Sequence, residues 1–391
     1  MTDISAFQPE VWTSSSNEAL KLFVTDPTGA INFQPQFTYP IFGDAESIYG
    51  YKDLVIYLCF DHFTFYPFLN IKYDKKIPND DQIVDIKSTM LKYLPTSTIF
   101  KDEVKWVDAI SEEKTSYKIP GVKLDDFTIK DEVYSVYKID LKSSSGVELH
   151  KRLQILVLLF IEAGSYIDIE DELWELYVVY KEGDEPSLVG YATVYNYWKY
   201  PGFDKFDKGL VEIRKKISQF IVLPNHQGNG VGGTFYNRLY SIWANDDKVK
   251  EIVVEDPNES FDDMRDRSDL VRISRDINFD EISTAKITKE WFAATKAALK
   301  LETRQLSRLL EMILLHKLKR NTSHDSKKSI RLFIKTRLYN KNREGLVALD
   351  EATRKDKLQS AYESLESDYY RILGNIDLTS TNDPPQKKQR V

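Results

Sequence analysis

The chain has 391 residues, of which 42% are hydrophobic, 29% are charged and 13% are aromatic, and its formal net charge is −7. This apolar content excludes a wholly disordered chain, and the length favours two or three domains. The single cysteine, Cys59, excludes an internal disulfide and a cysteine-based metal site, and the spacing of the five histidines argues against a metal enzyme.

The N-terminal residues lack the basic and apolar stretches of a signal peptide. No apolar run reaches the length of a membrane span, which is about 18 residues. The longest such run, at residues 155–161, is expected in a core. We therefore expect a soluble protein of a reducing compartment, either the cytosol or the nucleus.

Residues 1–115 are predicted to form a β-rich N-terminal domain. Val55–Phe60 and Phe63–Tyr73 are rich in β-branched and aromatic residues, which is typical of paired strands. Asn79–Asp81 predicts a turn, and the spacing of apolar residues predicts a helix over 81–94 that ends before a proline.

Residues 116–272 are predicted to form a mixed α/β domain. A long helix with a broad apolar face is expected over 146–166, ending at Gly164. A strand, a glycine-rich loop, a helix and another strand then follow, an order that indicates a mixed α/β fold. The strands predicted here are Leu173–Tyr180, Leu188–Tyr197, Lys216–Leu223 and Val249–Val254, and the helices are Thr234–Ala244 and Phe261–Arg272.

Residues 273–376 are predicted to form a helical domain, and 377–391 a disordered tail. Apolar residues recur at helical spacing over 287–321 and 326–374. The predicted apolar stripe of the first of these segments consists of Leu299, Leu301, Leu306, Leu309, Leu310, Ile313 and Leu314.

The charge is unevenly distributed along the chain. Residues 317–343 hold ten Lys and Arg residues against one Asp, whereas the rest is acidic, with clusters at Asp168–Glu175 and Glu255–Asp269. The basic segment suits either contact with nucleic acid or an acidic protein, or the polar faces of helices, which we favour. The acidic surface suits either basic partners or simple solubility.

A glycine-rich loop directly follows the predicted strand Lys216–Leu223. Glycines let the backbone turn tightly and let a ligand approach the amide groups at a helix start, which suits a pyrophosphate. A dinucleotide-binding loop and a P-loop both fit poorly, because the spacing is G-x-G-x-G-G and the loop has no lysine. The pattern Gln-x-x-Gly-x-Gly, Gln227 to Gly232, instead resembles the coenzyme A pyrophosphate loop of the Gcn5-related N-acetyltransferase (GNAT) superfamily.

Four stretches resemble a particular family of this superfamily, the type B histone acetyltransferase catalytic subunits of yeasts. They are Phe37–Asp44, Leu159–Ala163, Val194–Trp198 and Val254–Glu259, in this order within residues 8–320. The resemblance implies an enzyme of the cytoplasm and nucleus. It would transfer acetyl from acetyl-CoA to lysines in the N-terminal tail of newly made histone H4, before chromatin assembly and without a metal.

The resemblance also implies where acetyl-CoA binds. Main-chain groups of Phe220, Ile221 and Val222 would pair with the pantetheine arm as with an added strand, a role compatible with an ordinary core strand. Asn258 and Arg267 are weaker candidates on the far wall. The residues expected around the pyrophosphate are Gln227, Gly228, Asn229, Gly230, Val231, Gly232 and Gly233.

Acetyl transfer needs a neutral lysine amine, and at pH 7 only one amine in about 2,500 is uncharged. Glu255, at a predicted strand end, is the leading general base, and burial there would raise its pKa. Asp256 beside it is a candidate, as is Glu162 on the apolar face of the predicted long helix. From the residues alone Glu255 is an ordinary strand-end acid, and only the family resemblance makes it the first choice.

A basic, extended histone tail should meet an acidic and aromatic groove. Without the resemblance, Trp174 and Tyr195 are equally compatible with core positions. The residues that match family positions meeting the tail are Asp44, Ala45, Glu46, Trp174, Tyr195, Asn196 and Tyr197.

The family works with a WD-repeat histone chaperone subunit, and the loop Tyr200–Gly209 lies where the family contacts that partner. Phe203 and Phe206 would be exposed anchors, and a self-packed surface loop is the alternative. No direct contact with nucleic acid or membrane is expected. Lys387–Arg390 is a weak nuclear-import signal.

Two other functions stay open. An acetyltransferase for a different amine would keep the glycine loop without needing the acidic groove. A non-catalytic histone-binding protein would keep the acidic surface without needing the loop and Glu255.

Overall fold

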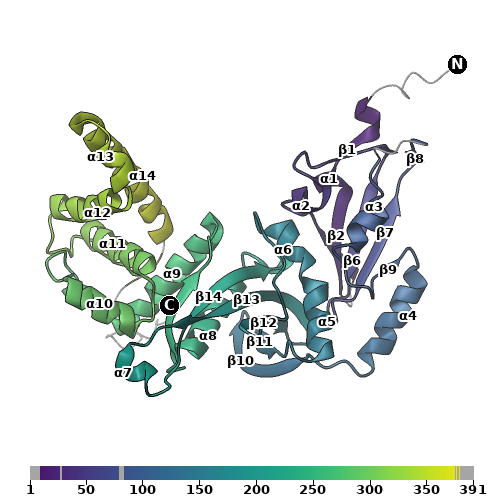
Figure 1. The fold of residues 1–391 in the computed structure, drawn as a ribbon, viewed down its shortest axis with the longest axis horizontal. Coiled ribbons are helices and arrows are strands. Elements are labelled where there is room, and N and C mark those ends of the chain that lie inside the picture. Colours follow the sequence, from purple (N-terminus) through teal and green to yellow (C-terminus); the bar gives the residue numbers. More distant parts are fainter. Residues whose placement is uncertain (1–8, 27–28, 79–82, 375, 377, 379–391) are drawn as a thin grey trace, which may run out of the picture. The chain divides into compact units, whose positions relative to one another are not determined.

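The computed structural model describes residues 9–26, 29–78, 83–374, 376 and 378. They form two units: Met1–Tyr197 with Lys216–Val231, and Trp198–Lys215 with Gly232–Val391. The predicted mixed α/β class with a helical C-terminal part is confirmed (Figure 1). The finer boundaries at residues 115, 272 and 376 stay predictions. The predicted turn at 79–81 lies outside the described residues, as does the predicted tail apart from Leu378.

A mixed five-stranded sheet, in the order β3-β2-β6-β7-β9, forms the N-terminal part of the first unit. β2 runs parallel to β6 and antiparallel to β3, and β6 runs antiparallel to β7. Buried and half-buried side chains alternate along β6, as the period of a strand demands. The strands are β2 (Leu20–Asp26), β3 (Gly29–Phe33), β6 (Val55–Phe60), β7 (Pro67–Lys72) and β9 (Ile99–Phe100).

Two predictions in this region are too long. The second strand begins at Pro67 and not at Phe63, because Asp61 Oδ2 accepts the backbone N–H groups of Phe63 and Thr64 and so forms a turn. The predicted helix 81–94 is reduced to α3 (Ile86–Leu91), whose N-terminus is capped by the Asp85 side chain. Both elements therefore begin later than predicted, after a short acidic side chain that offers the backbone a local acceptor.

Smaller elements surround this sheet. The two-stranded pairs are β1 (Thr13–Ser15) with β4 (Ser47–Tyr49) and β5 (Tyr51–Lys52) with β8 (Lys75–Lys76). The short helices are η2 (Pro9–Trp12), α1 (Ser16–Ala19), α2 (Tyr39–Phe42) and α4 (Glu103–Lys114).

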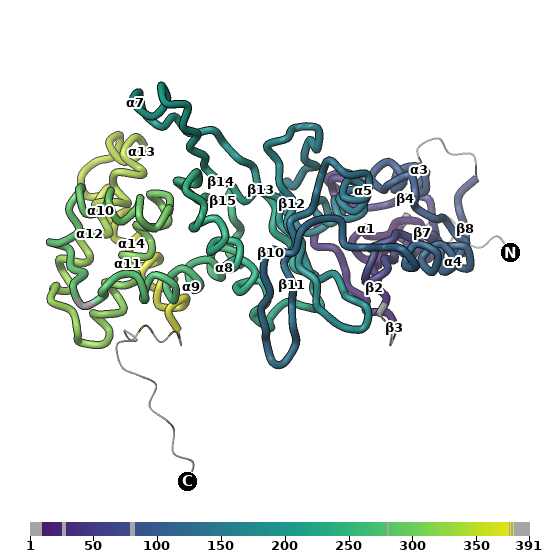
Figure 2. Tube along the Cα trace, turned by 90° about the horizontal axis from the view of Figure 1, so that it is seen from below, coloured from purple at the N-terminus to yellow at the C-terminus, as the bar shows by residue number. Residues whose placement is uncertain are grey.

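A six-stranded sheet follows in the order β10-β11-β12-β13-β14-β15. The four predicted strands are present within a few residues. β10 and β11 were not predicted. Most side chains of β10 are exposed, and a register shift interrupts the apolar alternation of its sequence. The two strands form the long hairpin of Figure 2. The strands are β10 (Gly121–Ile129), β11 (Glu132–Ile139), β12 (Trp174–Lys181), β13 (Ser187–Lys199), β14 (Glu212–Val222) and β15 (Val249–Val254).

The predicted long helix over 146–166 is two helices, α5 (Ser144–Leu153) and α6 (Ile155–Phe160). The backbone leaves the helix at Ile161, which is extended, and Ala163 has a φ of 55°. The predicted end at Gly164 is therefore wrong by several residues. Glu162 lies in the following turn and not on a helix face.

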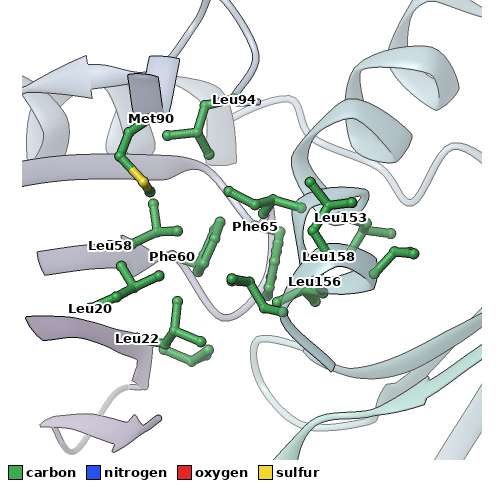
Figure 3. Close-up of a cluster of buried hydrophobic side chains, with 14 of the residues drawn as sticks. Leu20, Leu22, Leu58, Phe60, Phe65, Met90, Leu94, Leu153, Leu156 and Leu158 are labelled. Atoms are coloured by element: carbon green, nitrogen blue, oxygen red, sulfur yellow. The ribbon is translucent and has the colours of Figure 1, made fainter. Parts of the chain in front are cut away.

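A large apolar cluster lies in the first unit. Figure 3 shows Leu20 and Leu22 of β2 beside Leu58 and Phe60 of β6, with Phe65 between these strands and the side chains of α5 and α6. Phe60 and Phe65 are stacked with ring centroids 4.3 Å apart. All five side chains are fully buried. Each such burial contributes about 1.5–3 kcal/mol of stabilisation.

Helices dominate the second unit. The predicted stripe on α11 is confirmed, since Leu306, Leu309, Leu310, Ile313 and Leu314 are fully buried, and α11 lies against α9, α12 and α14. No helix of the described residues is both long and apolar enough to span a membrane. The helices are α7 (Phe203–Phe206), α8 (Val231–Ala244), α9 (Glu259–Asp276), η4 (Phe279–Glu281), α10 (Lys289–Ala298), α11 (Thr303–Lys319), α12 (Lys327–Lys341), α13 (Arg343–Val347) and α14 (Glu351–Leu373).

Buried charges join α9 to α11. Arg265, which is fully buried, donates to Glu302 at 2.9 Å and lies 3.7 Å from Asp269. Gln305 of α11 donates to both Asp266 and Asp269 at 2.9 Å. The packing of these helices is therefore fixed by directed polar contacts as well as by the apolar stripe.

Part of the basic segment 317–343 also has an internal role. Lys317 donates to the carbonyls of Phe279 and Ile282 at 2.8 Å, and Arg337 pairs with buried Glu311 of α11. These two residues support the reading of the segment as helix faces.

Candidate active site

The glycine-rich loop runs from β14 to α8. Pro224–His226 form a short 3-10 helix (η3), and Gly228 and Gly230 have φ angles of 73° and 85°. A Cβ at either glycine would meet no atom within 4 Å, so the backbone angle, and not lack of space, favours glycine there. Gln227 ties the loop to its strand, because its Nε2 donates to the carbonyl of Val222 at 2.7 Å.

Helix α8 begins at Val231, three residues before the predicted start at Thr234. Val231, Gly232 and Gly233 therefore lie in its first turn, where backbone N–H groups lack helical acceptors and attract anions. Gly233 also has a packing reason, since a Cβ there would lie 3.2 Å from Ser268 Oγ of α9. The first turn of α8 thus combines anion-binding potential with close helix packing.

His226 in this loop was not singled out by the sequence. Burial lowers its pKa to about 4, with a smaller effect of Lys181 in the same direction. The imidazole is therefore neutral at pH 7. Backbone N–H groups, and not an imidazolium, must supply the attraction for an anion.

The end of β14 places Phe220, Ile221 and Val222 immediately before the loop. Ile221 is buried in the apolar cluster, and the other two side chains are half-buried. On β13, a Cβ built on Gly190 would lie only 2.3 Å from the Ile221 carbonyl oxygen. β13 approaches this backbone so closely that only glycine fits.

The candidate bases differ from the expectation in their burial. Glu255 and Asp256 directly follow β15 and are exposed, and Asp256 has a φ of 33°. The prediction that Glu255 is buried is therefore wrong for the chain alone, because the strand ends at Val254. Glu162 is exposed too, in the turn after α6. Cys59 is no rival nucleophile, since burial raises its pKa to about 12, with a further effect of Glu103.

Asn258 and Arg267, the two far-wall candidates, both have internal partners. Asn258 Oδ1 caps α9 by accepting the backbone N–H of Phe261 at 2.9 Å. Arg267 donates to the carbonyl of Ile372 at 3.2 Å and to Asp263 at 3.3 Å. The end of α14 therefore contacts the guanidinium of Arg267. The sequence gave no hint that α14 lies near these residues.

The aromatic substrate candidates gather at the start of β12 and the end of β13. Ring centroids of Trp174 and Tyr195 are 4.9 Å apart, and those of Tyr195 and Tyr197 are 4.7 Å apart. The Tyr195 hydroxyl donates to Asp171 at 2.9 Å, a bond that raises the tyrosine pKa. Asn196 donates to the Leu173 carbonyl. Trp174 and Tyr195 are only half-buried, so neither is a core residue.

The three predicted substrate-binding residues that follow α2 are of two kinds. Asp44 and Ala45 are exposed. Glu46 instead accepts the backbone N–H groups of Thr38 and Tyr39 at 2.6 and 3.0 Å, and the Thr38 bond most strongly lowers its pKa. Glu46 therefore holds the start of α2 as an ionised carboxylate.

Comparison with known proteins now identifies the family. The model of "Histone acetyl transferase HAT1 N-terminus" matches residues 12–162, that of the "Acetyltransferase (GNAT) family" matches 135–260, and that of "Fungal HAT1, C-terminal" matches 266–319. A protein named histone acetyltransferase type B catalytic subunit, from Candida albicans, is 60% identical over 99% of this chain and 97% of its own length. The chain belongs to this family.

Two further family members carry the same name. The protein of Debaryomyces hansenii is 59% identical over 97% of this chain and 94% of its own length. That of Kluyveromyces lactis is 44% identical over 94% of both chains. The resemblance found in the sequence is thus confirmed.

Membership of the family makes the chain an acetyltransferase of the GNAT superfamily, whose members use acetyl-CoA. The predicted loop residues lie together, as do Trp174, Tyr195 and Tyr197. Within the described ranges, no three His, Cys, Asp or Glu side chains gather as a metal site requires.

Proposed function

We propose that this type B histone acetyltransferase acts on lysines in the N-terminal tail of histone H4, with acetyl-CoA as acetyl donor and Glu255 as general base. The observation that carries the proposal is the passage from β14 through the Gln227–Gly230 loop into α8, together with a carboxylate at the end of β15. A strand that leads into a helix N-terminus offers main-chain donors first to an amide-bearing arm and then to phosphates.

The loop fits a pyrophosphate in three respects. Gly228 and Gly230 take angles that expose backbone groups, Gln227 fixes the loop to β14, and the first turn of α8 supplies N–H donors. Phe220–Val222 would hold the pantetheine arm through the main chain. Asn258 and Arg267 stay weaker candidates, since binding there requires them to leave their present partners.

In the proposed reaction Glu255 accepts a proton from the substrate ammonium group. The neutral amine attacks the thioester carbonyl and the new C–N bond forms. As the C–S bond breaks, the nitrogen loses its second proton, and the departing coenzyme A sulfur takes up this proton and leaves as the free thiol. Asp256 follows Glu255 in the chain and is a further candidate for the role of general base. Glu162 is the alternative base. Because Glu255 is exposed in the chain alone, its activation depends on water being excluded when the substrates bind.

The aromatic cluster and the acidic residues around it suit a histone tail. The faces of Trp174, Tyr195 and Tyr197 offer contact to an aliphatic lysine stem, and Asp171 is fixed beside them by Tyr195. Asp44 and Ala45 are further candidates with Asn196, whereas Glu46 supports them by holding α2. The alternative small-amine substrate has no need of this surface.

A WD-repeat histone chaperone is the proposed partner, together with the core histone that accompanies histone H4. The end of β13 and the segment between β13 and β14 expose apolar side chains around α7: Trp198 57%, Tyr200 55%, Phe203 71% and Phe206 53%. Exposed aromatic clusters of this kind serve as interface anchors. The proposed compartments are the cytoplasm and the nucleus. The candidate import signal Lys387–Arg390 lies outside the described residues.

The test uses purified chain, acetyl-CoA and a histone H4 tail peptide, with release of free thiol as the signal. The wild type should acetylate the peptide in preference to a small polyamine. Glu255→Gln should lower kcat by about 10²-fold or more, because general-base catalysis contributes that factor. Glu162→Gln is the matched control and should have a much smaller effect.

Each outcome has a distinct meaning. Preference for the polyamine would refute the histone substrate and leave the superfamily chemistry intact. A larger loss with Glu162→Gln would move the base to that residue. Binding of acetyl-CoA without turnover of any amine, even with the WD-repeat subunit present, would refute the catalytic assignment of Glu255.

A further inference from the structure

A groove of about 730 Å³ lies in the first unit where β10 starts, β11 ends and β12 starts. Trp174, at the start of β12, lines this groove and also belongs to the aromatic cluster with Tyr195. The groove thus begins at the proposed substrate surface and continues away from it along the ends of β11 and β10. We call it the β10–β12 groove.

Part of the lining of the β10–β12 groove is apolar. Val122 is 67% exposed, and Leu124, Leu141 and Val147 are half-buried beside Trp174. Val122 lies on the outermost strand of the sheet, where folding does not require an apolar side chain. An exposed apolar surface of this kind suits contact with an aliphatic or extended segment of another chain.

Carboxylates surround this apolar surface. Asp140, Glu170, Asp171, Glu172 and Glu175 line the groove together with only two cations, Lys138 and Lys142. Both lysines are paired within the groove, Lys138 with Glu175 at 2.7 Å and Lys142 with Glu172 at 2.8 Å. Three negative charges are therefore not balanced within the groove. Its charge is complementary to a cationic segment.

We infer that the β10–β12 groove binds a second, basic segment of the histone substrate, a few residues from the acetylated lysine. The inference rests on the proposed function, because it extends the substrate surface that begins at Trp174. The aliphatic stems of lysine or arginine side chains would lie on Val122, Leu124 and Trp174. Their charged ends would point toward Glu170 and toward Glu172, whose exposed ion pair with Lys142 would then exchange Lys142 for the ligand. The groove would then select for basic residues flanking the target lysine, separately from recognition of the target itself.

The test compares peptides that share the same target lysine. One is short, a second is lengthened with the natural basic residues on one side or the other, and a third has these residues replaced by glutamine. The wild type should show a higher kcat/KM for one lengthened basic peptide than for the short or glutamine peptide. In the variant Glu170→Lys with Glu172→Lys, this ratio should fall by about tenfold, and the effect should weaken with added salt.

A matched control reverses two acids elsewhere in the same unit. Asp108 and Glu112 are exposed residues of α4 outside the groove lining, so Asp108→Lys with Glu112→Lys makes the same change in net charge. The control should keep the wild-type ratio between lengthened and short peptides. Circular dichroism and thermal unfolding should show that both variants are folded.

The outcomes separate this inference from the proposed function. If the wild type acetylates no histone peptide, the proposed function fails. If it acetylates all peptides, yet the ratio is the same in the groove variant, the control and the wild type, the groove inference fails alone. If the ratio falls equally in the groove variant and the control, general electrostatic attraction explains the preference and the groove is again refuted.

Discussion

The main cluster of the first unit is built from apolar side chains, whereas helices of the second unit also meet across buried charges. In the first unit Leu20, Leu22 and Leu58 pack together without a polar atom in their side chains. In the second, Asp269 is fully buried and accepts Tyr236, Gln305 and Arg272. The same chain thus uses two means of holding its elements together.

The apolar and the charged contacts differ more in how strictly they require a particular geometry than in how strongly they stabilise the fold. Apolar burial is favourable in almost any arrangement that excludes water. A buried ion is tolerated only when its partners are in place, and a missing partner leaves a large desolvation penalty. The second unit should therefore respond sharply to the loss of one side chain, yet tolerate replacement of a whole polar set.

The largest expected effect comes from removing one ion of the second unit. Arg265→Met removes the fully buried cation that pairs with Glu302 and leaves Arg272 as the only one of its two arginine neighbours beside Asp269. It should lower the free energy of unfolding by about 3–5 kcal/mol. Hydrogen exchange read by mass spectrometry should show the loss of protection first in α9 and α11.

Leu22→Ala in the first unit is the matched truncation, with an expected loss of about 2–5 kcal/mol that depends on how far the cavity collapses. Its effect should appear in β2 and β6. Equal loss of protection in both units with either variant would contradict the comparison, because the chain would then unfold as one block.

An intermediate effect concerns pH. Burial, with a smaller effect of Lys151, lowers the pKa of His150 in α5 to about 4, below its value of about 6.5 in an unfolded chain. A lowered folded pKa gives stability that is present above pH 6.5 and lost as pH falls towards 4. The wild type should therefore lose about 2–3 kcal/mol between pH 7 and pH 4.5 through this group.

His150→Leu should remove that part of the acid sensitivity, as urea unfolding at the two pH values would show. In the second unit burial instead raises the pKa values of Asp266 and Glu311, so their protonation does not oppose folding in the same range. Identical pH slopes of the wild type and His150→Leu would show that the imidazole titrates normally in the folded chain.

The smallest effect is expected when a complete polar set is replaced. Glu311 accepts both Arg337 and the Tyr369 hydroxyl. The triple change Glu311→Leu, Arg337→Met and Tyr369→Phe should alter stability by no more than about 1–2 kcal/mol, because an apolar set replaces a satisfied ionic one. Arg337→Met alone should lower the free energy of unfolding by clearly more than the triple change does. If the triple variant is the less stable of the two, the ion pair contributes net stability.

The sequence predicted those strands and helices in which apolar side chains, at the spacing of a strand or of a helix, face a core while the others face water. β15 has its predicted bounds and the stripe on α11 is buried as expected, since both follow from apolar spacing. β10 escaped prediction because it is an edge strand with mostly exposed side chains, and its internal partner β11 was missed with it. The loop Gln227–Gly230 was recognised from its glycines, and the positive φ angles of Gly228 and Gly230 explain why glycine stands there.

Contacts between distant residues were beyond the sequence. Nothing in the spacing of Arg267 indicates that it meets Ile372, and nothing around Glu46 indicates that it holds the start of α2. The exposure of Glu255 and Glu162 was also missed, because it depends on where β15 and α6 end. Chemistry that rests on local pattern was therefore predicted, and chemistry that rests on tertiary contact was not.

Gly190 has a consequence for how this family can vary. Its missing side chain leaves β13 close to the Ile221 carbonyl, at a distance of 2.3 Å for any added Cβ. Even alanine would push the backbone at residues 220–222 out of place. In a library of all single substitutions, position 190 should accept no residue but glycine, although it offers no side chain to the chemistry.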